Sequence, residues 1–383
     1  MSSRAQQLLD LGQSVWLDFI RRGPLVSGEF ARQVREDGVV GVTSNPSIFQ
    51  QAIAKSTDYD EAMVAGVAKG LAGEVLYESF AIADIQTACD QLRAVYDATQ
   101  GRDGRVSLEV SPRLAHDSAG TLAAAKRLHA AVARPNVMIK IPATQAGLPA
   151  ITASLAAGIS INVTLIFSLA RYRQVMDAWL AGLEQLVAAG GDPATVRSVA
   201  SFFVSRVDSK VDAAIEQRAA TLPAGSTERT ELEALRGKAA VANARVAYAA
   251  FEQVVGSPRY QALAARGAHV QRPLWASTST KNPAYRDVLY VEELIGPDTV
   301  NTIPPQTLAA FNDHGVVESR IRNDLAGAQA LFTRLPALGV PVDALIDQLE
   351  AEGVVAFEKS YDDLLAALET RVRAMSGGSG ASR

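Results

Sequence analysis

Residues 137–142, Val-Met-Ile-Lys-Ile-Pro, place one charged side chain in an otherwise apolar run that is typical of a β-strand. Strand alternation puts Lys140 on the face opposite Ile139 and Ile141, and Pro142 ends the strand because it lacks an amide hydrogen. At the carboxyl end of a strand in a parallel α/β barrel, apolar neighbours favour the neutral, nucleophilic form of a lysine, which can attack a carbonyl carbon. The alternative is an edge-strand lysine that extends its ammonium group into water.

Two carboxylates occur in comparable apolar runs. Asp18 lies within Val-Trp-Leu-Asp-Phe-Ile, and Glu109 lies within Val-Ser-Leu-Glu-Val. Burying a carboxylate costs free energy unless the group is paired or used. By itself Asp18 could equally be a structural aspartate that accepts backbone hydrogen bonds. A second acid in the same setting favours a shared polar centre with acid–base chemistry.

Amide and hydroxyl side chains form a second group of candidates. Asn162 and Thr164 alternate with apolar residues in Ile-Asn-Val-Thr-Leu, so both lie on one strand face, which we expect to point inward beside Lys140. Asn45 precedes Pro46 at the end of another β-rich run, and capping of a following helix is enough to explain that pair.

Cations that follow two later strands predict an anion site. Arg206 follows a segment that also holds Ser201 and Phe203, and Lys281 follows Ala-Ser-Thr-Ser-Thr. Barrels often hold a phosphate after the seventh strand, where hydroxyls and backbone amides accompany Lys281 in this chain. The alternative for both cations is a solvated loop charge.

Eight β-rich runs, each followed by polar residues, glycine or proline, must position these side chains. They cover residues 14–20, 39–43, 106–110, 137–141, 160–166, 198–204, 273–277 and 300–303. Helical segments separate the runs, and eight βα units predict an α/β fold, the (β/α)8 TIM barrel. Additional covering helices are predicted at 59–69, 75–96, 211–220 and 231–255.

The 383 residues, of which 48% are hydrophobic, exceed the roughly 250 of a bare barrel and indicate one elaborated domain. We predict a single domain over residues 1–375 with a helical insertion at about 210–267. The apolar face of its last helix should pack on the barrel or over its mouth; this face comprises Phe357, Tyr361, Leu364, Leu365, Leu368 and Val372. Residues 376–383 have linker composition and are predicted to form a disordered tail.

Composition excludes several classes of function. The 37 basic and 41 acidic side chains give a net charge of −4, which argues against a chain-wide affinity for nucleic acid. No leader pattern and no apolar run of about 18 residues occurs, so we expect a cytoplasmic protein with no membrane partner. Cys89 is the only cysteine, which rules out an internal disulfide. The four histidines show no metal-ligand spacing, so no metal site is predicted.

Three segments resemble segments of the transaldolase family. Residues 41–49, Gly-Val-Thr-Ser-Asn-Pro-Ser-Ile-Phe, and residues 137–144, Val-Met-Ile-Lys-Ile-Pro-Ala-Thr, resemble its two signatures. Residues 161–168, Ile-Asn-Val-Thr-Leu-Ile-Phe-Ser, are similar to its fifth-strand segment. The resemblance runs from about 14 to 305 in order, on the strands inferred from the residues alone. The segment at about 210–267 cannot be placed against the family and reads as inserted helix.

The resemblance implies roles for individual residues. Lys140 matches the Schiff-base lysine, Glu109 and Asp18 match acid–base groups, and Thr164 matches the side chain that holds a catalytic water. The implied substrate-binding residues are Asn45, Asn162, Ser201, Phe203, Arg206, Ser279 and Lys281. Arg206 would bind phosphate. Members of the family often carry arginine where Lys281 stands, and either Ser277 or Ser279 could be the accompanying serine.

By this resemblance the protein is a transferase of the pentose phosphate pathway that needs no cofactor. It would move a dihydroxyacetone unit from sedoheptulose 7-phosphate or fructose 6-phosphate to glyceraldehyde 3-phosphate or erythrose 4-phosphate. Sugar phosphates would be its partners, and a homodimer is a candidate assembly. One alternative is a Schiff-base aldolase that releases free dihydroxyacetone, although such aldolases tend to carry tyrosine where Phe203 stands. The other is a sugar-phosphate-binding barrel without turnover, which would be expected to lack Lys140, Glu109 or Asp18.

Overall fold

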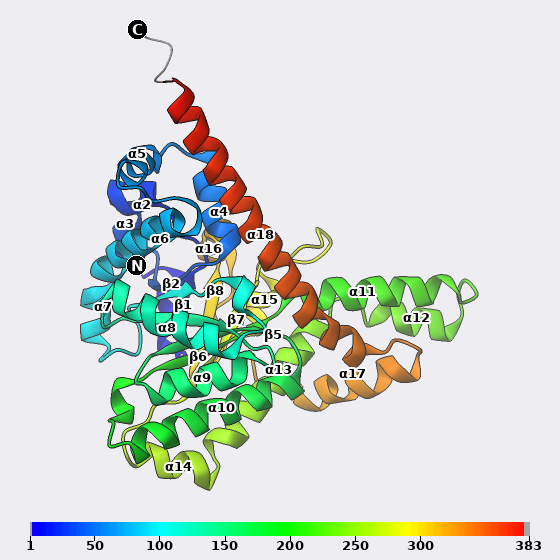
Figure 1. Ribbon diagram of the computed structural model, residues 1–383. Helices are drawn as coiled ribbons and strands as arrows, with labels where there is room; N and C mark the ends of the chain where they lie inside the picture. The colour runs from blue at the N-terminus through cyan, green and yellow to red at the C-terminus, as the bar shows by residue number, and fades with distance from the viewer. Residues whose placement is uncertain (1, 379–383) are drawn as a thin grey trace.

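The computed structural model of the protein describes residues 2–378. Within them, eight parallel strands pair in chain order and close into a barrel with helices around it (Figure 1). The strands are β1 (Gln13–Leu17), β2 (Val39–Thr43), β3 (Arg105–Glu109), β4 (Val137–Pro142), β5 (Ile161–Ile166), β6 (Ser198–Phe203), β7 (Gln271–Ala276) and β8 (Thr299–Ile303). The predicted (β/α)8 TIM barrel is confirmed.

The strands form where the β-rich runs predicted them, because apolar and β-branched residues suit a sheet that is covered on both faces. The end of β1 differs from the prediction. The strand stops at Leu17, and Asp18 follows it, with its backbone amide still donating to the Ile303 carbonyl of β8 at 3.0 Å. Asp18 therefore lies at the rim of the barrel rather than inside a strand.

Helices of varied length connect the strands and cover the barrel (Figure 1). In the first half these are α1 (Arg4–Asp10), α2 (Arg22–Ser27), α3 (Glu29–Glu36), α4 (Pro46–Lys55), α5 (Asp60–Ala68), α6 (Gly73–Gln91), α7 (Arg93–Ala98), α8 (Ser118–Val132), α9 (Gly147–Ala156) and α10 (Leu169–Ala188). The 3₁₀ turns η1 (Pro112–Leu114) and η2 (Pro193–Thr195) are short. The helix predicted at 75–96 is divided between α6 and α7 at Leu92.

The segment after β6 is helical, as predicted, but its helices are divided differently. They are α11 (Ser205–Ala220), α12 (Thr227–Ala234), α13 (Ala239–Val255) and α14 (Pro258–Ala264). The single helix predicted at 231–255 is interrupted because Gly237 has φ +70° and donates its amide to Asp212 at 2.9 Å. The division of the chain into one domain with an insertion at about 210–267 stays a prediction.

The last helices are α15 (Leu289–Glu293), α16 (Pro305–His314), α17 (Leu325–Ala337) and α18 (Val342–Gly378). As predicted, α18 turns its apolar face toward the barrel: Phe357 and Leu364 are buried, and the helix packs along α4 and against β5 (Figure 1). The helix continues through Gly378, three residues into the predicted tail, and residues 379–383 lie outside the described part of the chain.

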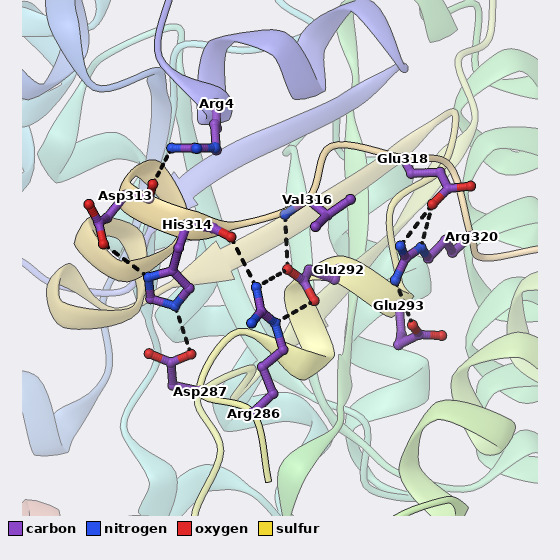
Figure 2. A network of polar contacts seen from close by, with 10 residues as sticks. All are labelled: Arg4, Arg286, Asp287, Glu292, Glu293, Asp313, His314, Val316, Glu318 and Arg320. Carbon is purple, nitrogen blue, oxygen red and sulfur yellow. Dashed lines mark hydrogen bonds and ion pairs between the residues drawn. The ribbon is translucent and has the colours of Figure 1, made fainter.

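Ion pairs hold the loop that follows β7. Figure 2 shows the Arg286 guanidinium donating to both carboxylate oxygens of Glu292 at 2.9 Å and to the His314 carbonyl at 2.9 Å. The imidazole Nε2 of His314 lies 3.0 Å from Asp287 Oδ1. These contacts join the loop that carries Lys281 to α15 and to the end of α16. Among residues 2–378, none of the helices combines the length and apolar character that a membrane crossing requires.

Candidate active site

Lys140 lies on β4 between β3 and β5, with 5% of its surface exposed. A closed barrel has no edge strand, so the alternative of a solvated edge lysine does not apply. The Nζ atom is 3.2 Å from Glu109 Oε2 and donates to the Ser44 carbonyl at 3.2 Å. The Phe357 ring of α18 lies 5.9 Å from Nζ. An amine and a carboxylate are thus held together beneath an aromatic lid.

The register of the strands aligns the candidates across the barrel. Glu109 pairs with Lys140, and Lys140 pairs with Asn162. Paired residues on parallel strands point to the same side of a sheet, so these three side chains share the barrel interior. Asn162 is fully buried, donates to Ser107 Oγ at 3.0 Å and accepts from Ser201 Oγ at 2.7 Å.

Alternating residues of β3 and of the β5 segment face one another at successive levels. At the lowest level Arg105 donates to Ser160 Oγ at 3.2 Å, and at the middle level Asn162 donates to Ser107. By the same alternation Glu109 and Thr164 share the upper level. Here Glu109 Oε2 and Thr164 Oγ1 are both buried. Glu109 Oε2 faces the Lys140 ammonium at 3.2 Å, whereas Thr164 Oγ1 makes no hydrogen bond to any of residues 2–378. Buried polar atoms of this kind call for an additional partner such as a water molecule.

Both acids at the rim have perturbed ionisation. Burial raises the pKa of Asp18 and of Glu109 above the ordinary carboxylate range, and the nearby Lys140 opposes the shift only in part. The Thr43 hydroxyl donates to Asp18 Oδ1 at 3.0 Å and fixes its orientation. Carboxyl groups with raised pKa values are suited to proton transfer near neutral pH.

Asn45 caps α4, as its local sequence predicted. Its Oδ1 accepts from the Ile48 amide at 2.9 Å, and Pro46 occupies the first turn of the helix. Its Nδ2 makes no hydrogen bond to the described residues, so the capping role leaves both amide hydrogens available. The side chain is partly exposed at the barrel mouth.

Arg206, in the first turn of α11, is partly buried beside Phe203. Its Cζ lies 5.5 Å from the Phe203 ring, which in turn contacts Phe167 at 5.0 Å between ring centroids. Burial lowers the pKa of Arg206, and the charge of Glu352 opposes that shift. Arg206 makes no hydrogen bond or ion pair with any of residues 2–378. A guanidinium group without protein acceptors remains able to bind an anion with its full fork.

The loop after β7 separates its two candidate serines. Lys281 is exposed and donates to Ser279 Oγ at 2.7 Å, so these two residues act together. Ser277 has φ +58° and its hydroxyl pairs with Ser205 Oγ at 3.0 Å, which ties it to the start of α11. The charge of Lys281 opposes the rise in the pKa of Asp18, which places this loop at the same mouth of the barrel.

Several residues at the site were not identified from the sequence. Ser107 shares a strand face with Glu109 at a spacing of two, and that spacing could have identified it. Thr43 and Ser44 lie within segment 41–49, of which the sequence analysis identified only Asn45 as a site residue. Phe357 was assigned to an apolar helix face, and only the tertiary fold brings it over Lys140. Within residues 2–378, no group of three or more histidine, cysteine or acidic side chains is arranged to hold a metal ion.

Known proteins of one family are similar to this chain along most of its length. A family model described as Transaldolase/Fructose-6-phosphate aldolase matches residues 15–368. The chain is 54% identical over 364 residues to Transaldolase 1 of Streptomyces coelicolor, covering 95% of this chain and 93% of that protein. It is 52% identical over 366 residues to the transaldolase of Thermobifida fusca, covering 95% and 97%. It is 45% identical over 372 residues to Transaldolase 2 of a Nostoc species, covering 97% and 98%.

Proposed function

Because the chain belongs to the transaldolase/fructose-6-phosphate aldolase family and has transaldolase activity, a group transfer of pentose phosphate metabolism, we propose that Lys140 forms the Schiff base of this reaction. The observation that carries the proposal is the burial of its amine 3.2 Å from Glu109. The donor is sedoheptulose 7-phosphate or fructose 6-phosphate, and the acceptor is glyceraldehyde 3-phosphate or erythrose 4-phosphate.

The first stage makes the iminium. Neutral Lys140 attacks the C2 ketone of the donor, and the resulting carbinolamine must lose hydroxide. Glu109 protonates the departing hydroxide through a water molecule that Thr164 holds. The support is the pair of buried oxygen atoms, Glu109 Oε2 and Thr164 Oγ1, which share one level of the barrel. Glu109 Oε2 lies beside Lys140, and Thr164 Oγ1 has no hydrogen-bond partner among residues 2–378.

The second stage breaks the C3–C4 bond. Asp18 removes the proton of the C4 hydroxyl, the electrons of the C3–C4 bond move into the iminium, and an aldose phosphate leaves. A dihydroxyacetone enamine remains on Lys140. The raised pKa of Asp18 supports this role, because a carboxylate that binds its proton more tightly can also return that proton when the acceptor adds.

Amide and hydroxyl groups hold the three-carbon unit. Asn162 has one amide hydrogen left after its bond to Ser107, Asn45 has two, and Ser201 is fixed against Asn162. The aromatic rings of Phe203 and Phe357 are apolar neighbours that would exclude water from the enamine. Phe203 also lacks the hydroxyl that would help water release free dihydroxyacetone, which favours transfer over cleavage.

The phosphate of donor and acceptor is bound by Arg206, with Ser279 and Lys281 across the mouth. Support comes from the unpaired fork of Arg206 and from the Lys281–Ser279 hydrogen bond at 2.7 Å. We also propose that the enzyme acts in the cytoplasm on these sugar phosphates, without nucleic acid or membrane partners. A homodimer stays a candidate assembly.

Borohydride reduction in the presence of fructose 6-phosphate tests the central claim. The expected result is a three-carbon or six-carbon adduct on Lys140, located by mass spectrometry of the peptides. Lys140→Met should abolish both the adduct and transfer, whereas Lys126→Met, which changes an exposed lysine of α8, should keep both. An adduct on another lysine, or none in an active preparation, would refute the assignment.

A further inference from the structure

A cavity, here called the lower cavity, lies at the opposite end of the barrel from Lys140. It has a volume of about 330 Å³ and is lined where the strands begin, by Arg105 at the start of β3, Ser198 at the start of β6 and Arg272 near the start of β7. Glu109 stands at the other end of β3. The four residue steps between Arg105 and Glu109 separate the two ends by about 13 Å.

Arginines dominate this cavity, which is lined by Arg102, Arg105, Arg197 and Arg272. Two of the four have carboxylate partners. Arg272 is 3.0 Å from Asp103, and Arg102 is 3.4 Å from Asp298. No carboxylate among residues 2–378 lies within ion-pair distance of the other two, so the cavity has an excess of two positive charges.

The two unpaired arginines are held by neutral groups. Arg105, only 2% exposed, donates to the Gly101 carbonyl at 2.9 Å and to Ser160, and stacks over Tyr96 with 5.0 Å between its Cζ and the ring centre. Arg197 donates to the Ala194 carbonyl at 2.7 Å and to the Gln100 carbonyl at 2.9 Å. These acceptors fix the orientation of both forks and leave their charges uncompensated.

This arrangement disfavours the charged forms of Arg105 and Arg197. Burial lowers the pKa of Arg105 to about 10 and that of Arg197 to about 10, and repulsion from Arg272 adds to both shifts, while the charge of Asp103 opposes the shift of Arg105. Buried cations are normally paired, and an anion placed between the forks would offset this effect. The active site does not use either arginine.

We propose that this cavity binds a small phosphate-bearing anion, either inorganic phosphate or the phosphate ester of a sugar. A phosphate dianion balances the excess of two positive charges, and guanidinium forks match its oxygen atoms in bidentate geometry. The volume admits a sugar attached to the phosphate, with Thr99 and Ser198 among the lining residues for its hydroxyls. A monocarboxylate would leave one charge uncompensated.

Calorimetric titration of the intact protein with inorganic phosphate tests the site. Wild type should bind two phosphates per chain, one at each end of the barrel. The Arg206→Ala variant should still bind the phosphate in the lower cavity. In the Arg206→Ala background, adding Arg197→Ala should weaken phosphate binding about tenfold or more, because it removes a charge-assisted fork. Adding Arg173→Ala, an exposed arginine of α10, should change it by less than about twofold.

A further titration identifies the ligand, and a second criterion applies if a variant does not fold. Glucose 6-phosphate titrated into Arg206→Ala at constant ionic strength should bind tighter than inorganic phosphate if the sugar is recognised, and equally if only the phosphoryl group is. Loss of all phosphate binding in Arg206→Ala would overturn the proposal, as would unchanged binding in the Arg197→Ala double variant. If that double variant fails to fold, the single variant Arg206→Ala decides, since one phosphate retained per chain supports the proposal and none retained overturns it.

Discussion

Replacing Arg206 by alanine should separate the binding of phosphate from the chemistry at Lys140. Among residues 2–378, Arg206 makes no hydrogen bond or ion pair, and its ring contact with Phe203, at 5.5 Å, contributes about 0.5–1 kcal/mol. The variant should therefore fold, with a loss of stability of about 1 kcal/mol or less. A charge-assisted hydrogen bond to phosphate contributes about 1.5–3 kcal/mol, so kcat/KM for fructose 6-phosphate should fall about ten- to hundredfold.

The loss should be selective for phosphorylated substrates. Dihydroxyacetone used as donor has no phosphate, and its carbons are held by Asn45 and Asn162, so its weak reaction should be nearly unchanged in Arg206→Ala. Steady-state kinetics with both donors, beside thermal unfolding, gives the comparison. Lys281→Ala should lower kcat/KM for fructose 6-phosphate less than Arg206→Ala does, because an exposed ammonium acts as a point charge without a fork. Equal depression of both donors would mean that Arg206 supports the fold or the chemistry, and the phosphate would move to Lys281 with the backbone of 277–280.

Two further variants test the acid–base groups. Thr164→Val removes a buried hydroxyl that has no hydrogen-bond partner within the described residues, so stability should hold or rise while kcat falls about a hundredfold. Unchanged kcat in a fully folded variant would exclude a water held at Thr164. Asp18→Asn should abolish transfer and raise the melting temperature at pH 7. The sign follows from the raised pKa of Asp18: the folded state resists ionisation more than the unfolded chain, so wild type loses stability as pH rises from the ordinary value of 3.8 through the raised one. The higher melting temperature of Asp18→Asn relative to wild type should therefore disappear near pH 4. An equal difference in melting temperature at pH 4 and pH 7 would contradict the raised pKa as its cause.

The upper level of the barrel could be predicted from the sequence because each of its residues carries a local signal. Lys140 and Glu109 interrupt apolar runs at the ends of strands, and strand order alone makes β3 and β4 neighbours. Their contact at 3.2 Å then follows from parallel pairing in register. Asn45 shows the limit of such signals, since one side chain fits helix capping and substrate binding equally well, and the capping bond is the one present.

The lower cavity carried no comparable signal. Arg105, Arg197 and Arg272 are each more than 70 residues apart in the sequence and lie at or beside the starts of three different strands. An arginine at such a position usually indicates a solvated charge. They meet only because the barrel closes, and their charges matter because no carboxylate within residues 2–378 forms an ion pair with Arg105 or Arg197. The placement of Phe357 over Lys140 depends in the same way on the path of α18 across the barrel.

One face of β3 thus carries a cation at its start and an acid at its end, with the neutral pair of Ser107 and Asn162 between them. Over about 13 Å, at an effective dielectric constant of about 20, two unit charges interact by about 1 kcal/mol. An anion bound beside Arg105 would cancel most of that attraction and make Glu109 harder to ionise, which changes its protonation equilibrium by at most about tenfold. Any larger effect of the lower cavity on catalysis would therefore have to pass through the hydrogen bonds of Ser107 and Asn162 rather than through the field.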